Sequence, residues 1–127
     1  MGKENIARNK SKSFAVRIVN LYKHLCDEKK EYVLSKQVLR SGTSIGANLA
    51  EAEYAISEKD FLAKVYIALK ESAETVFWLE LLFQTEYLTE TEYNSINEDA
   101  LALLKMLKAT TKTLSTKLNS TNLNSNI

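Results

Sequence analysis

The sequence contains no proline and only three glycines among its 127 residues. These two residues form most turns, and an all-β sandwich or barrel needs a turn roughly every 8–12 residues. The near absence of both excludes such folds and predicts an all-α protein. The chain is also shorter than the roughly 150 residues typical of a domain, so we expect one domain.

The sequence also has only one cysteine and one histidine. Cys26 has no partner for an intrachain disulfide, and a cysteine zinc site would need further soft ligands. A di-iron four-helix bundle needs Glu-x-x-His pairs, but Leu21 stands three residues before His24. We therefore predict neither a metal nor a cofactor.

Long hydrophobic runs are missing as well. The basic N-terminal segment is not followed by the apolar stretch of a signal peptide, because Arg17, Asn20 and Lys23 interrupt residues 14–25. No run approaches the roughly 18 apolar residues that a membrane helix requires. We expect a cytoplasmic protein that does not contact membranes.

Apolar residues recur at helical spacing in four segments that are separated by short polar breaks. Ser57, followed by acidic residues, is typical of a helix start, and Thr89 with Glu92 forms a capping-box pattern. The predicted helices cover residues 11–27, 33–56, 58–86 and 90–118. Because the connections are short, residues 1–118 are predicted to form an antiparallel up-down-up-down four-helix bundle. Residues 119–127 lack periodicity and are predicted to be a disordered polar tail.

The net charge of +1 hides a strong asymmetry along the chain. Residues 1–24 carry a net charge of +5 and residues 100–127 carry +4, whereas the segment between them carries −8. The predicted topology brings the two basic segments to the same end of the bundle. One interpretation is a solvated surface, and the other is a site for RNA or DNA. In the second case the contact residues would be Lys10, Lys12, Arg17, Lys105, Lys108, Lys112 and Lys117.

The third predicted helix is apolar around its whole circumference over residues 75–83. A bundle helix in a monomer needs only one apolar stripe. Large exposed apolar patches are unusual on monomers, so we expect a second face to be buried against another copy of the chain. The interface candidates are Phe77, Trp78, Leu81 and Leu82. The alternative is a thick core that leaves Trp78 partly exposed.

A polar stripe lies beside the apolar face of the second predicted helix. Arg40, Ser44, Asn48 and Glu51 follow one another at spacings of three or four residues. If the second and third helices turn back at residues 56–58, positions whose numbers add to about 114 are opposite, which places Arg40 against Glu74 and Gly46 against Ala68. The complete stripe is Arg40, Ser44, Asn48, Glu51, Glu71, Ser72 and Glu74.

This stripe has two interpretations. It is either a set of ion pairs and hydrogen bonds that fixes the helix register, or a small polar pocket for a ligand. No histidine lies near it in the sequence, and a serine without a base is not an activated nucleophile. We therefore favour the structural interpretation. Gly42 and Gly46 lie within the same helix, where glycine costs about 1 kcal/mol relative to alanine, and so indicate the close approach of another helix.

Two stretches carry a resemblance to a known family. The segment RSGTSIGANLAEA at 40–52 and the segment ALKESAET at 68–75 resemble bacterial proteins first noticed as reading frames within intervening sequences of 23S ribosomal RNA genes. The accessory variability protein of diversity-generating retroelements is related to that family. The resemblance implies a four-helix bundle that assembles as a homopentameric ring, without established enzymatic activity. The retroelement protein is strongly basic and is thought to bind nucleic acid, whereas the net charge here is only +1.

One enzymatic alternative remains open at this point. Arg17 and His24 are seven residues apart, so both would lie on one face of the first helix, as in the Arg-x(4–6)-His motif of HEPN-like ribonucleases. We expect instead a non-enzymatic, oligomeric interaction protein. Its expected partners are other copies of the chain and RNA or DNA, and a further protein partner is left open.

Overall fold

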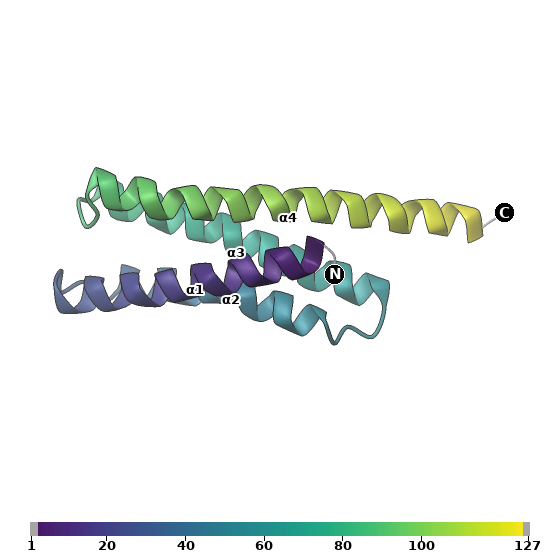
Figure 1. The fold of residues 1–127 in the computed structure, drawn as a ribbon, viewed down its shortest axis with the longest axis horizontal. Coiled ribbons are helices and arrows are strands. Elements are labelled where there is room, and N and C mark those ends of the chain that lie inside the picture. Colours follow the sequence, from purple (N-terminus) through teal and green to yellow (C-terminus); the bar gives the residue numbers. More distant parts are fainter. Residues whose placement is uncertain (1–2, 126–127) are drawn as a thin grey trace.

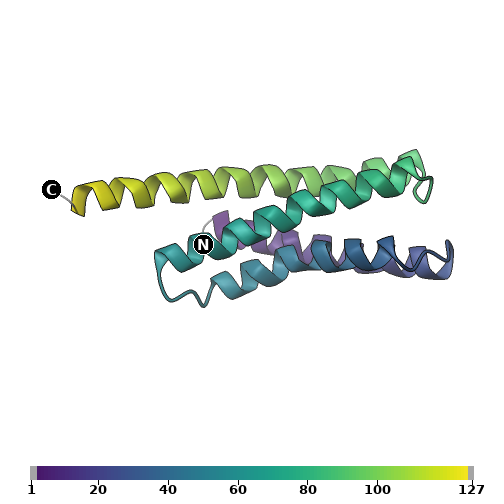
Figure 2. The same cartoon turned by 180° about the vertical axis from the view of Figure 1, so that it is seen from behind.

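The computed structural model describes residues 3–125, with side chains described from Ile6 to Ser120. It contains four helices, α1 (Lys3–Asp27), α2 (Leu34–Ala52), α3 (Glu58–Gln84) and α4 (Glu90–Ser125), and no strand within the described range. Successive helices run in opposite directions and pack side by side (Figure 1). The predicted all-α, four-helix architecture is confirmed. The start of α1 and the end of α4 lie at the same end of the bundle, and the view from behind agrees (Figure 2).

The starts of α3 and α4 follow the predicted capping patterns. The backbone N–H of Asp60 donates to the Ser57 hydroxyl at 3.0 Å. At the start of α4, the Glu92 N–H donates to the Thr89 hydroxyl, and the Thr89 N–H donates to the Glu92 carboxylate. Each bond satisfies an N–H that the first turn of a helix leaves unpaired.

The start of α2 is capped by a residue outside the helix. Val33 occupies the N-cap position and has no side chain that could accept a hydrogen bond. The buried carboxylate of Glu31 accepts instead from the backbone N–H groups of Val33, Leu34 and Ser35, at 2.7–3.1 Å. Burial by itself would raise the pKa of Glu31, but these backbone hydrogen bonds outweigh it and hold the pKa below its ordinary value.

Several helix ends differ from the predicted ones. The helix α1 starts at Lys3 rather than near residue 11, because nothing in residues 3–10 breaks a helix and Ala7 is buried against the core. The helix α2 stops at Ala52, where a tight turn begins. The helix α3 stops at Gln84, and Glu86 just beyond it has a positive φ of 68°.

The C-terminal segment also differs from the prediction. Residues 119–125 continue α4 as helix, whereas we predicted disorder from residue 119. No glycine or proline follows residue 46, so nothing in the sequence stops the helix. Residues 126 and 127 lie outside the described range.

The core runs along the bundle axis and takes residues from all four helices. Fully buried members include Ile18, Ile45, Leu79 and Leu107. Gly42 allows α1 to approach α2 closely, because a Cβ at this position would lie 2.8 Å from the Ile18 side chain. Gly46 also faces α1, at Ser11, and the prediction that it faces Ala68 of α3 is wrong. Within the described range, no helix combines the length and hydrophobicity needed to cross a membrane.

Candidate functional site

Three lysines lie on the outer face of α4. Lys105, Lys108 and Lys112 are spaced by three and four residues, which places them on one side of the helix, and all three are exposed. Residues 100–117 contain no acidic residue. Among the described residues, no carboxylate forms an ion pair with any of the three ammonium groups. This lysine face therefore retains its full positive charge.

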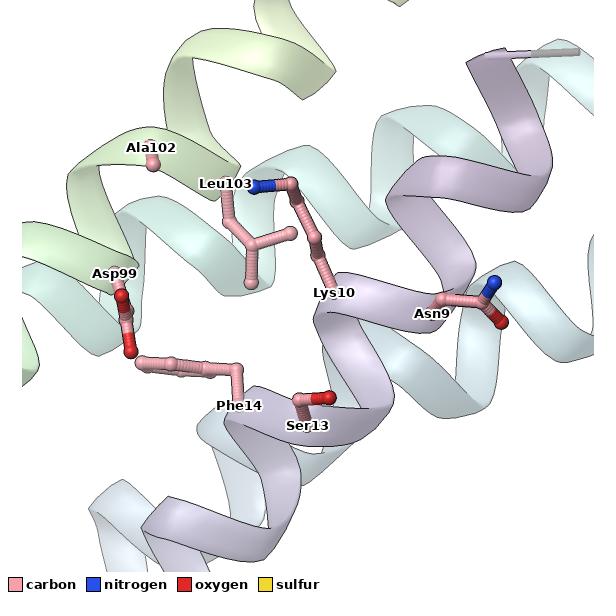
Figure 3. A pocket seen from close by; sticks show the side chains of 7 residues that line it. All are labelled: Asn9, Lys10, Ser13, Phe14, Asp99, Ala102 and Leu103. Carbon is pink, nitrogen blue, oxygen red and sulfur yellow. The ribbon is translucent and has the colours of Figure 1, made fainter.

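The two predicted lysines of α1 do not lie on the same side. Lys10 borders a cleft of about 240 Å³ between α1 and α4, and its side chain extends from α1 toward α4 (Figure 3). Lys12 follows two residues later, about 200° further around the helix. Only Lys10 therefore adds to the positive charge near α4.

The two remaining residues predicted to contact nucleic acid, Arg17 and Lys117, form ion pairs with acidic side chains. The Arg17 guanidinium donates to Asp99 at 2.6 Å and to the backbone carbonyl and hydroxyl of Ser95 at 3.1 and 2.8 Å. The Lys117 ammonium lies 4.0 Å from a carboxylate oxygen of Glu58. Arg17 therefore connects α1 to α4, and Lys117 connects α4 to the start of α3.

Arg17 and His24 line one groove of about 460 Å³ between α1 and the start of α4, so the predicted shared face is present. Asp99, however, neutralises Arg17. The Nε2 atom of His24 is buried without a hydrogen-bond partner, and it lies 3.8 Å from the Glu92 carboxylate. The arrangement does not direct both groups toward a common phosphate, so it gives no support to the ribonuclease alternative.

The polar stripe joins α2 to α3 through Arg40. Its guanidinium forms ion pairs with Glu71, at 3.3 Å, and with Glu74. The Glu74 carboxylate also accepts a hydrogen bond from the indole N–H of Trp78 at 2.8 Å. The predicted register between these helices is confirmed by the Arg40–Glu74 pair. In the single chain the Arg40 side chain remains 49% exposed.

The other members of the stripe use their polar groups within the fold. The Ser44 hydroxyl donates to the carbonyl of Arg40, and the Asn48 amide donates to the carbonyl of Ser44. Glu51 pairs with Lys64 of α3 at 3.2 Å. These bonds agree with a structural role. Among the described residues, no three His, Cys, Asp or Glu side chains are grouped so as to hold a metal ion.

Ser72 lies inside the bundle rather than on the stripe, with a buried hydroxyl that has no hydrogen-bond partner. The buried polar contact between α2 and α3 is made instead by Thr75, whose hydroxyl donates to that of Ser41 at 3.0 Å. This pair was not predicted from the sequence. The sequence held one signal for this buried contact, because Ser41 is a polar residue within the apolar stripe of the second predicted helix.

The four interface candidates of α3 differ in how far their side chains are exposed. Phe77 is 57% exposed and packs edge-on against Trp78, with ring centroids 5.0 Å apart. Trp78 and Leu81 are half-buried. Leu82 is completely buried in the core, so the prediction that it forms an interface is wrong. The reason is that α3 packs against both α2 and α4 and needs a wider apolar face than one stripe.

Comparisons with known proteins give the chain a family. Residues 3–109 match the model of a family described as 23S rRNA-intervening sequence protein. A similar solved structure is the crystal structure of a protein with unknown function from the S23 ribosomal protein family, from Bacteroides thetaiotaomicron VPI-5482. The two sequences are 58% identical, and the match covers 87% of this chain and 99% of the chain in that structure, with a TM-score of 0.85. No curated protein matches the chain. The match agrees with the four-helix layout, and the similar structure is of a protein with unknown function.

Proposed function

The chain belongs to the 23S rRNA-intervening sequence protein family, and from this premise we propose that it is a non-enzymatic, homo-oligomeric interaction protein of the cytoplasm. We further propose that it binds RNA or DNA through the outer face of α4. The single observation that carries the binding proposal is the lysine face of α4, three exposed ammonium groups without acidic partners.

The geometry of this face suits a phosphate backbone. Lys105 and Lys112 are seven residues apart, which corresponds to about 10 Å along a helix. A strand of duplex DNA carries a phosphate roughly every 3.4 Å along the axis. The three side chains can therefore contact phosphates of one strand without a rearrangement of the helix. Lys105 and Lys108 lie within the segment that matches the family model, and Lys112 lies beyond it.

The non-enzymatic part of the proposal is supported by how the polar residues are used. The groups of the polar stripe, apart from Ser72, are bonded to the helix backbone or paired between α2 and α3. Catalysis by a serine or threonine would require an adjacent base that activates the hydroxyl. Arg17, the residue that a ribonuclease motif would require, is neutralised by Asp99.

The oligomeric part rests on the apolar surface of α3. Tyr66, Ile67 and Phe77 are exposed on this helix, and burying them against another copy would remove apolar area from water. The family resemblance implies five copies. The chain mass is 14.4 kDa, so a pentamer would have a mass of five times that value, about 72 kDa, in sedimentation equilibrium.

The binding proposal is tested with two matched double variants. In Lys108→Gln/Lys112→Gln the lysine face loses two charges, while Lys105 is retained because it also borders a groove between α1 and α4. The control Lys36→Gln/Lys70→Gln removes two lysines from α2 and α3. Binding of a structured RNA and of a duplex DNA is measured by fluorescence anisotropy at low salt.

We expect the first variant to bind at least about tenfold more weakly than wild type, because phosphate contacts by lysine supply most non-specific affinity. The control variant should bind as wild type does. Equal losses in both variants would mean that overall charge, and not this face, is responsible. An absence of binding by the wild-type protein would overturn the nucleic-acid proposal and leave the oligomer as the property to explain.

A further inference from the structure

The lysine face of α4 continues toward the C-terminus with two hydroxyl groups. Ser115 follows Lys108 by seven residues and Thr116 follows Lys112 by four, so both lie on the side of the lysines. Within the described part of the chain, neither hydroxyl forms a hydrogen bond. The two threonines just before Lys112, in contrast, donate to backbone carbonyls of α4. The hydroxyls of Ser115 and Thr116 are therefore available to donate to a phosphate oxygen.

The row from Lys105 to Thr116 is straight and rigid. It spans eleven residues of one continuous helix, which corresponds to about 16 Å. The helix α4 has 36 residues, and its C-terminal end extends past α1 and past the α2–α3 connection (Figures 1 and 2). A straight row of this kind matches phosphates that are already held in a regular line.

A double helix presents such a line, because it stays straight over distances much longer than this row. It also carries one negative charge per roughly 1.7 Å of its axis, more than a single strand does. A flexible single strand would first have to lose conformational freedom to follow the row, and that loss reduces affinity. Both rigidity and charge density therefore favour a duplex.

The lysine face also lacks the groups that hold single strands. Proteins that bind single strands stack the bases on aromatic side chains, and this stacking supplies much of their affinity. The last aromatic residue of the sequence is Tyr93, which is half-buried and stacked on Phe83 with ring centroids 4.5 Å apart. On the neighbouring part of α1, Phe14 is only 2% exposed. No ring from these elements stands beside the lysines to receive a base.

We infer that the nucleic acid bound by the lysine face is a double helix and not a single strand. Lys105, Lys108 and Lys112 neutralise phosphates along one strand of the duplex, and the hydroxyls of Ser115 and Thr116 donate to phosphates further along it. This inference rests on the nucleic-acid binding proposed above. It adds the form of nucleic acid that is bound and two uncharged contact residues.

The form of nucleic acid is tested with one labelled DNA strand, measured alone and annealed to its complement. Binding of the full-length protein is followed by fluorescence anisotropy at the same low salt concentration. We expect the duplex to bind about tenfold more tightly than the strand alone, because its charge density is higher and its phosphates are already in line. Single-strand binding as tight as duplex binding, or tighter, would overturn this inference and leave the proposed function standing. If neither form binds, both fail.

The contact by a hydroxyl is tested with two matched variants, Thr116→Ala and Thr113→Ala. Thr113 is also an exposed threonine without a hydrogen bond among the described residues, but it lies about 100° around the helix from Lys112 and borders the groove between α1 and α4. Circular dichroism checks that both variants remain folded.

We expect Thr116→Ala to weaken duplex binding by about threefold, the effect of one hydrogen bond. The slope of log affinity against log salt should not change, because no charge has been removed. Thr113→Ala should bind the duplex as wild type does. Unchanged binding by Thr116→Ala, or an equal loss in both variants, would overturn the contact along this row.

Discussion

Arg40 of α2 forms an ion pair with Glu74 of α3, and the same carboxylate accepts the indole N–H of Trp78. The ion pair joins two helices through residues that are 34 positions apart in the sequence. The pair lies at the surface of the single chain, with 49% of the arginine side chain exposed. Its contribution to stability therefore depends on whether another copy covers it.

Replacing Arg40 with methionine is expected to lower the free energy of unfolding by less than about 1 kcal/mol, because exposed ion pairs contribute little. Urea denaturation of the wild type and of the Arg40→Met variant measures the difference. A loss of about 3 kcal/mol or more would be the signature of a buried pair. It would mean that the α2–α3 surface around Arg40 is covered in the assembled protein.

Replacing Glu31 with glutamine removes the charged cap of α2. Three backbone N–H groups donate to this carboxylate, and a neutral amide is a weaker acceptor. We expect Glu31→Gln to lower the free energy of unfolding by about 1–2 kcal/mol, the usual effect of removing a helix cap. Equal stability of the variant and the wild type in urea denaturation would show that the start of α2 does not depend on this charge.

The same carboxylate predicts a dependence of stability on pH. The folded pKa of Glu31 lies below its unfolded value, so its stabilising effect is complete above the unfolded pKa and disappears as the pH falls through the folded pKa. The pKa of Glu92 is also lowered, chiefly by the backbone hydrogen bond from Thr89. Wild-type stability, followed by urea denaturation, should therefore fall as the pH decreases below about 4.3, the ordinary pKa of a glutamate. The fall should be shallower in Glu31→Gln, and identical slopes would contradict this assignment.

The two internal glycines of α2 form a matched pair for testing how closely α1 packs. A Cβ at position 42 would lie 2.8 Å from the buried Ile18 side chain, whereas at position 46 the nearest atom, the Ser11 hydroxyl oxygen, is 3.3 Å away. We expect Gly42→Ala to destabilise the protein by about 1–3 kcal/mol, because the core would be overpacked. Gly46→Ala should change stability by less than about 1 kcal/mol, since the gain in helix propensity offsets the closer contact. Thermal unfolding of both variants tests this, and a larger loss at position 46 would contradict the packing described.

The sequence predicts most of the fold because helical periodicity and capping patterns are local signals. The capping box of Thr89 and Glu92 and the pairing of Arg40 with Glu74 could be predicted in this way. The start of α1 could not, because residues 3–10 are mostly polar and add little to the apolar stripe. The cap at Glu31 was also missed, since it acts from a position before the helix.

The site was harder to predict than the fold. Contacts between distant residues, such as Arg17 and Asp99, decide which basic groups are neutralised. The packing of α1 on α4 decides which lysines of α1 lie near the lysine face. The position of the start of α1 beside the end of α2 follows from the Arg8–Glu53 pair. No spacing within the sequence encodes any of these relationships. Leu82 shows the same limit, because an all-apolar segment does not reveal which side becomes the core.

Binding of nucleic acid through the lysine face of α4 is tested most directly by the salt dependence of the affinity. Anisotropy titrations of a duplex DNA at several salt concentrations give the slope of log affinity against log salt. We predict a linear fall in the wild type, and a slope that is shallower in Lys108→Gln/Lys112→Gln by about one for each phosphate that a lysine no longer neutralises. A slope near zero, or the same slope in wild type and variant, would contradict binding through this face.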